Sequence, residues 1–100
     1  MEGRRFRALE IGVPYHRQGL IFFTARCFDT QPRQIQTMVL DACERAGREN
    51  AEALFAYVTT GRSKESVMTQ YYIASETTLN RMVRRFFHVM DEEMRKRGRR

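Results

Sequence analysis

The clearest pattern of hydrophobic and polar positions lies between residues 29 and 47. Its apolar residues recur at the i, i+3, i+4 and i+7 spacing that places side chains on one face of a helix. They are Ile35, Met38, Val39, Ala42, Cys43 and Ala46. Asp29 or Thr30 is the expected N-cap, with Pro32 in the first turn and Gly47 as the C-terminal stop. The segment is therefore predicted to be an amphipathic helix.

A second strong pattern follows Ser75, the expected N-cap of a helix that runs from Glu76 to about Arg95. At about 100° of rotation per residue, its large apolar side chains fall within one broad arc. They are Leu79, Val83, Phe86, Phe87, Met90 and Met94, with Met82 at the edge. The opposite arc holds Thr77, Arg81, Arg84 and His88, flanked by Thr78 and Arg85. This polar arc is the solvated side of an amphipathic helix, and it is also the candidate ligand-binding surface.

The segment from residue 15 to 28 is more ambiguous. Leu20, Phe23 and Cys27 share one helical stripe, with Ile21, Ala25 and Phe28 beside it. The run "LIFF" within it also fits a short strand, because so short an apolar run has no decisive period. A helix is favoured, since nothing nearby resembles a partner strand.

Two short helices are expected between the two strong patterns. The first is capped by Asn50 and ends at Gly61, and its apolar stripe is Ala51, Leu54, Phe55 and Val58. The second follows Ser63 as N-cap, and its inward residues are expected to be Val67, Met68, Tyr71 and Tyr72.

Together these segments predict an all-α fold, a compact bundle of about five helices that contains a C-terminal helix-turn-helix with a long last helix. The chain has 100 residues, which is the size of one domain. That domain is expected at residues 14–96, with the helix-turn-helix at about 63–90. A loose arm at residues 1–13 and a basic tail at 97–100 flank it.

The charge of the chain narrows the choice of partner. Of the formal net charge of +6, the segment from Arg62 to Arg100 contributes +5, because it holds ten Lys/Arg against five Asp/Glu. A basic balance of this kind favours an anionic partner, usually nucleic acid, over a small-molecule substrate.

The sequence contains no motif typical of a catalytic site and no feature typical of a secreted or membrane protein. His16 and His88 are far apart, and neither has an HExxH motif or a carboxylate pair around it; a glycine-rich phosphate loop is also missing. A non-enzyme without cofactor or metal is therefore predicted. Cys27 and Cys43 have no CxxC spacing and are expected to be free thiols in the cytoplasm. Neither a membrane span nor a secretory signal is predicted.

The order of the last two helices is that of a helix-turn-helix. A short helix is followed by a tight turn and then by a helix with its polar face forward, and the start of that second helix is rich in Ser, Thr, Asn and Arg. These side chains reach phosphates and base edges. The expected nucleic-acid-binding residues are Ser75, Thr77, Thr78, Asn80, Arg81, Arg84, Arg85 and His88.

The stretch "SKESVMTQYYIASETTLNRMVRRFF" resembles the helix-turn-helix of bacterial transcription factors, in which an apolar residue and a serine precede Thr-Val/Leu-x-Arg. Ser75, Thr78, Leu79 and Arg81 match these places. The resemblance implies that Ser75 caps the recognition helix, that Leu79 anchors it and that Arg81 faces DNA. The chain departs from the pattern in the turn, where Ile73 or Tyr72 stands at a position that commonly holds glycine. A β-branched isoleucine is poorly suited to a left-handed backbone.

Residues 16–90 as a whole are similar to small prophage-encoded helix-turn-helix proteins of Gram-positive bacteria. The resemblance implies a phage or prophage transcriptional regulator that binds double-stranded DNA with helix 76–95 as recognition helix, with a homodimer as one arrangement. The alternative is a non-enzymatic adaptor that binds RNA polymerase or another host protein. A DNA-binding protein should present a basic face, whereas an adaptor should present exposed aromatic residues or leucines.

Overall fold

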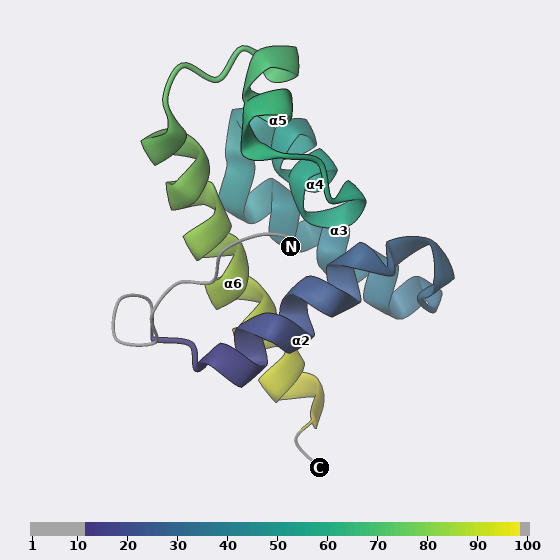
Figure 1. Cartoon of the computed structure of the whole chain (residues 1–100). Coiled ribbons are helices and arrows are strands. Elements are labelled where there is room, and N and C mark those ends of the chain that lie inside the picture. Colours follow the sequence, from purple (N-terminus) through teal and green to yellow (C-terminus); the bar gives the residue numbers. More distant parts are fainter. Residues whose placement is uncertain (1–11, 99–100) are drawn as a thin grey trace.

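The computed structural model describes residues 12–98, and every regular element in that range is helical (Figure 1). The all-α fold class is therefore confirmed. The elements in chain order are α2 (Tyr15–Arg26), the 3-10 helix η1 (Phe28–Thr30), α3 (Arg33–Gly47), the 3-10 helix η2 (Arg48–Asn50), α4 (Ala51–Thr60), α5 (Lys64–Tyr71) and α6 (Glu76–Gly98). The segment from residue 19 to 25 lies in α2, so it is a helix and not a strand.

The long helix α6 runs down one side of the molecule, with α5 beside its beginning and α2 crossing its C-terminal half (Figure 1). Helix α3 packs against both α4 and α6, and α2 packs against the same two helices. Because α6 contacts α2, α3, α4 and α5, its apolar face is enclosed by the rest of the bundle.

The core consists largely of the two faces that the apolar spacing predicts. On α6, Leu79, Met82, Val83, Phe86, Phe87 and Met90 are buried and Met94 packs against them. On α3, Met38, Val39, Ala42, Cys43 and Ala46 are buried and Ile35 packs against the core. Edge-to-face ring pairs add contacts between helices: Phe22 with Phe87 at 5.6 Å between centroids, and Phe28 with Phe55 at 5.0 Å. Both face assignments are confirmed.

Serine hydroxyls begin the last two helices, as predicted. Ser63 Oγ accepts a hydrogen bond from the Ser66 backbone N–H at 3.1 Å, and Ser75 Oγ accepts one from the Thr78 N–H at 3.2 Å. Gly61 ends α4 in the left-handed conformation, with φ of 78°. The two serine hydroxyls satisfy backbone N–H groups that the start of a helix leaves without partners.

Two other expected caps are not formed. Pro32 is the N-cap residue of α3, while Asp29 and Thr30 belong to η1 and lie too early in the chain to cap α3. Asn50 is at the N-cap position of α4, but its side chain makes no capping hydrogen bond. The prediction for α3 was wrong because the short 3-10 turn separates the polar residues from the first helical turn.

Helix α3 does end at Gly47, but the positive φ lies one residue later. Gly47 has an ordinary φ of −96°, whereas Arg48 has φ of 53° and ψ of −120°. Gly47 is buried, and a Cβ built on it would lie 3.4 Å from Leu54 Cβ and Cδ2. A Cβ at these distances would make ordinary van der Waals contacts, so neither the space nor the backbone at position 47 requires glycine, and Arg48 carries the conformational cost of the turn.

The stripe of Leu20, Phe23 and Cys27 is not the buried face of α2; the residues expected beside it include buried ones. Leu20 and Phe23 are 48% and 65% exposed, and the buried residues of α2 are Ile21, Ala25 and Gln18. Gln18 can be buried because its Nε2 donates a hydrogen bond to the Val13 carbonyl oxygen at 2.7 Å. A helix that is apolar on most sides gives no clear choice of face, which explains the error.

The chain ends also differ from the prediction where they are described. Residues 1–11 and 99–100 lie outside the described residues. Val13, the last residue of the expected arm, is fully buried in the core. Helix α6 continues to Gly98, so Arg97 belongs to the helix and not to a separate tail.

Candidate nucleic-acid interface

The connection from α5 to α6 fixes where the candidate surface begins. Ser75 caps α6, and its hydroxyl also lies 3.4 Å from Thr78 Oγ1. Lys64 Nζ on α5 lies 3.3 Å from Glu76 Oε2 on α6, which ties the starts of the two helices together. The hydroxyls of Ser75 and Thr78 are therefore engaged in building the helix start, although Ser75 is exposed.

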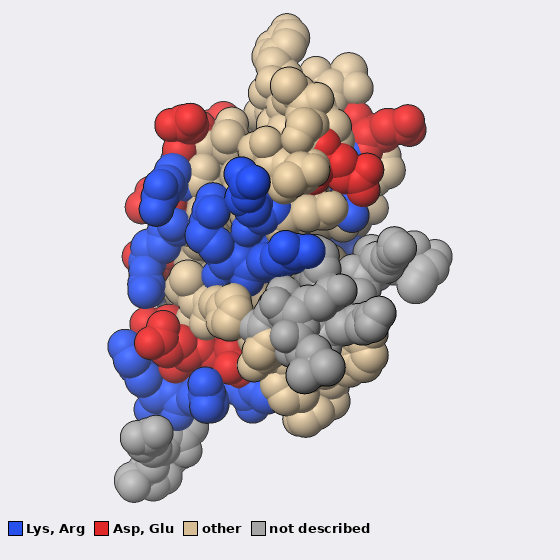
Figure 2. Space-filling model, turned by 90° about the vertical axis from the view of Figure 1, so that its left-hand side faces the viewer, with Lys and Arg blue, Asp and Glu red and all other residues tan. Residues whose placement is uncertain are grey.

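Four of the predicted site residues form one exposed stripe on α6: Thr77, Arg81, Arg84 and His88. Their i, i+4, i+7 and i+11 spacing makes the stripe about 16 Å long. Figure 2 views the side of the molecule along which α6 runs, and Lys and Arg side chains gather in the middle of that face. Among residues 12–98, Arg81 has neither a hydrogen bond nor an ion pair, so its guanidinium is available to a ligand.

Arg85 and Asn80 are placed differently from that stripe. Arg85 is half-buried, and its Nε donates a hydrogen bond to the Ala46 carbonyl oxygen at 3.0 Å. That carbonyl is one of the last four of α3, which lack partners within the helix. Asn80 is half-buried too, and within the described chain its Oδ1 is buried without a hydrogen-bond partner. Arg85 therefore has a structural role that the sequence did not reveal, and Asn80 is not presented outward.

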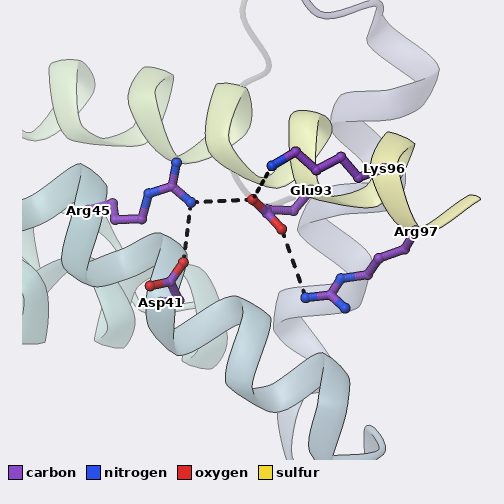
Figure 3. Close-up of polar contacts among 5 residues, drawn as sticks. All are labelled: Asp41, Arg45, Glu93, Lys96 and Arg97. Atoms are coloured by element: carbon purple, nitrogen blue, oxygen red, sulfur yellow. Dashed lines mark hydrogen bonds and ion pairs between the residues drawn. The ribbon is translucent and has the colours of Figure 1, made fainter.

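The C-terminal half of α6 has its positive charges offset by carboxylates. Asp91 is buried and is ion-paired with Arg17 on α2 and with Arg95 at 3.3 Å. Glu93 binds Arg45 on α3 at 3.4 Å, together with its helix neighbours Lys96 and Arg97 at 3.4 and 3.9 Å (Figure 3).

The pKa values of this ion-pair cluster follow from its contacts. A hydrogen bond to Asp41, 3.2 Å away, is the largest cause that raises the pKa of Arg45. Desolvation by itself would raise the pKa of Glu93, but Lys96 and Arg45 outweigh it and hold that pKa below its ordinary value. Glu93 is therefore ionised at neutral pH, and it locally offsets the basic residues around it. In the first half of α6, by contrast, Arg81 has no ion pair among the described residues.

Two features of the surface were missed by the sequence reasoning. Tyr72, expected to point inward, is 92% exposed and has a left-handed backbone, with φ of 58° and ψ of 42°. Leu20 and Phe23 expose apolar surface on α2. Tyr72 points outward because it is the C-cap residue of α5 and lies outside the helical spacing on which its inward placement was based.

Three or more His, Cys, Asp or Glu side chains that could hold a metal ion do not come together anywhere in residues 12–98. Both cysteines are free, and burial raises the pKa of the Cys43 thiol to about 12, which makes it a poor nucleophile. Within the described range, none of the helices is long and apolar enough to cross a membrane.

The exposed stripe on α6 presents guanidinium, hydroxyl and imidazole groups in a line along a rigid helix. Such an array can donate several hydrogen bonds to phosphate oxygens at once. No family model, curated protein or solved structure matches the chain, so the interpretation of this surface rests on its own geometry.

Proposed function

We propose that the protein is a helix-turn-helix DNA-binding protein, a phage or prophage transcriptional regulator, that places the first half of α6 in the major groove. The observation that carries the proposal is the exposed Thr77, Arg81 and Arg84 stripe, in which Arg81 lacks an intramolecular partner among the described residues. Helix α5 would be the first helix of the motif and α6 the recognition helix, joined through residues 72–75.

The packing of α6 supports this orientation. Its apolar face is enclosed by four other helices, so only the basic and hydroxyl-bearing face is available to a partner. A single helix fits the major groove, which is about 12 Å wide. Arg81 lies in the second turn, where recognition helices approach base edges, whereas Arg84 lies one turn further on and suits a phosphate. Most of the affinity would come from neutralised phosphates, and would therefore depend on salt.

The test is fluorescence anisotropy at two salt concentrations with two labelled duplexes, one of random sequence and one selected for tight binding to the wild type. It compares wild type with Arg81→Ala and Arg84→Ala. If Arg81 contacts a guanine in a preferred site, its loss should cost about 1–3 kcal/mol on that site. Each lost phosphate contact should flatten the slope of log K against log salt by about 0.9. Arg33→Ala is the matched control, because Arg33 is an exposed arginine at the start of α3, away from the first turns of α6 (Figure 1).

Equal losses in Arg33→Ala and in Arg81→Ala would show that binding depends only on net charge. Wild-type protein that fails to bind any duplex at low salt would refute the proposed function.

A second candidate function, the protein-binding adaptor, is favoured by the exposed Leu20 and Phe23 on α2. Exposed leucine and aromatic side chains are the surface expected of a protein contact, whether with RNA polymerase or with a second copy of the chain. Phe23→Ser would weaken binding to purified RNA polymerase if the adaptor hypothesis holds. Sedimentation of the wild type and the same variant tests the homodimer. The adaptor hypothesis is wrong if wild-type protein binds duplex DNA and shows no affinity for the polymerase.

A further inference from the structure

Tyr72 occupies an unusual place at the end of α5. It is the C-cap residue, its backbone N–H bonds to the Met68 carbonyl, and its φ of 58° and ψ of 42° are left-handed. The next residue, Ile73, donates its N–H to the same carbonyl at 2.9 Å and is buried, 7% exposed. Ile73 thus anchors the turn in the core, while Tyr72 projects from it and is 92% exposed.

Neither the backbone nor the side chain of Tyr72 favours the folded state. A residue with a Cβ is disfavoured in the left-handed region, where glycine or asparagine is the usual helix C-terminal residue. A side chain that is 92% exposed has almost no packing contacts to offset that cost. The neighbouring Tyr71 packs against the core instead. Strained, exposed residues of this kind are a recurrent feature of functional sites.

The position of Tyr72 relative to α6 suggests what it contacts. It is the first residue of the connection 72–75 that joins α5 to α6, and it precedes Thr77, where the exposed stripe begins, by five residues. A tyrosine hydroxyl is a hydrogen-bond donor at the end of a rigid aromatic side chain. When a recognition helix lies in the major groove, residues flanking it meet the phosphates along the groove edge.

We propose that Tyr72 is a DNA-backbone contact of this protein, in which its phenolic hydroxyl donates a hydrogen bond to a phosphate oxygen beside the groove that holds α6. The inference rests on the proposed function and adds to it a contact from the turn between the two helices. A phosphate is the partner of choice because the bases of an intact duplex are stacked on one another and do not offer a free face to a tyrosine ring.

The test compares Tyr72→Gly, Tyr72→Phe and the control Tyr15→Phe, in which Tyr15 is 50% exposed on α2. Thermal melting and anisotropy with a random-sequence duplex are measured for each. Tyr72→Gly should raise the melting temperature, because it relieves the left-handed strain, and yet weaken duplex binding about tenfold. Tyr72→Phe should weaken binding by a similar factor, and Tyr15→Phe should leave it unchanged. A purely structural role for Tyr72 would not raise stability and lower affinity in the same variant.

The salt dependence gives an independent readout. The hydroxyl is neutral, so Tyr72→Phe should lower the affinity at every salt concentration without changing the slope, unlike Arg84→Ala. Full affinity in Tyr72→Phe with a loss in Tyr72→Gly would replace the phosphate contact by ring packing and overturn the proposal. Wild-type affinity in both, with a loss in Arg81→Ala, would refute the Tyr72 contact and leave the proposed function standing. A wild type that binds no duplex would refute both.

Discussion

Replacing Arg48 by glycine should stabilise the protein. Arg48 follows α3 and has φ of 53° and ψ of −120°, a region of backbone conformation that glycine adopts readily and other residues avoid. Its side chain is exposed, so little packing is lost when it is removed. The preceding Gly47 cannot take over the role, because it is the last helical residue of α3, with φ of −96°.

The size of the effect follows from two opposing terms. A non-glycine residue in a sparsely populated region costs on the order of 1–3 kcal/mol. Glycine in turn loses about 0.5–1 kcal/mol more conformational freedom on folding than a residue with a Cβ. The net gain is about 1 kcal/mol, which corresponds to a rise of roughly 4–8 °C in melting temperature for a domain of this size.

The assay is thermal and urea unfolding of Arg48→Gly beside Arg81→Gly. Arg81 is an exposed arginine within α6, so the same substitution there should cost about 1 kcal/mol, as glycine does in a helix interior. The two variants lose the same side chain and the same charge, and should shift the urea midpoint in opposite directions. A destabilised Arg48→Gly would refute the assignment of strain to this turn.

Two further predictions concern the core. Leu79→Ala and Phe86→Ala should each destabilise the domain by about 2–5 kcal/mol, since both side chains are fully buried, whereas Thr77→Ala on the exposed face should change the free energy of unfolding by less than about 0.5 kcal/mol in a urea titration. Burial raises the pKa of Cys43 from 9.0 to about 12, so the folded state holds this proton more tightly than the unfolded state. The associated stability is present below pH 9 and is lost as the pH rises toward 12, by up to about 1.4 kcal/mol per pH unit. Cys43→Ala should remove that slope, and equal slopes in both proteins between pH 9 and 10.5 would contradict the assignment.

The parts of the fold that the sequence predicted correctly are those with a one-sided apolar pattern. The apolar residues of α3 and α6 occupy one arc of each helix and polar residues occupy the rest, so only one orientation buries the arc. The serines at positions 63 and 75 precede such arcs directly, and both form the predicted caps. On the candidate surface, Thr77, Arg81, Arg84 and His88 were placed correctly on the outside for the same reason.

Of the remaining features, some depend on contacts between elements distant in sequence and others on the conformation of a local turn. In α2, apolar residues lie on most sides of the helix, and the inward face was decided by Phe22 meeting Phe87 and by Gln18 meeting Val13. The role of Arg85 depends on a carbonyl of α3, 39 residues earlier. The outward position of Tyr72 follows from the left-handed turn, which buries Ile73 in its place. None of these partners is apparent from local spacing.

The exposed face and the buried face of α6 are formed by almost separate sets of residues. A substitution on one face can therefore be interpreted without a change in the other. Arg81 can be truncated without loss of a described contact, and Leu79 can be truncated without any change in the exposed charge. Arg85 is the exception, because it adds positive charge next to the stripe and also hydrogen-bonds the Ala46 carbonyl at the end of α3. Its removal would leave that carbonyl without its partner and loosen the contact that orients α6 on α3. Weaker DNA binding by Arg85→Ala would therefore combine lost charge with a displaced helix, whereas weaker binding by Arg81→Ala can be attributed to the surface alone.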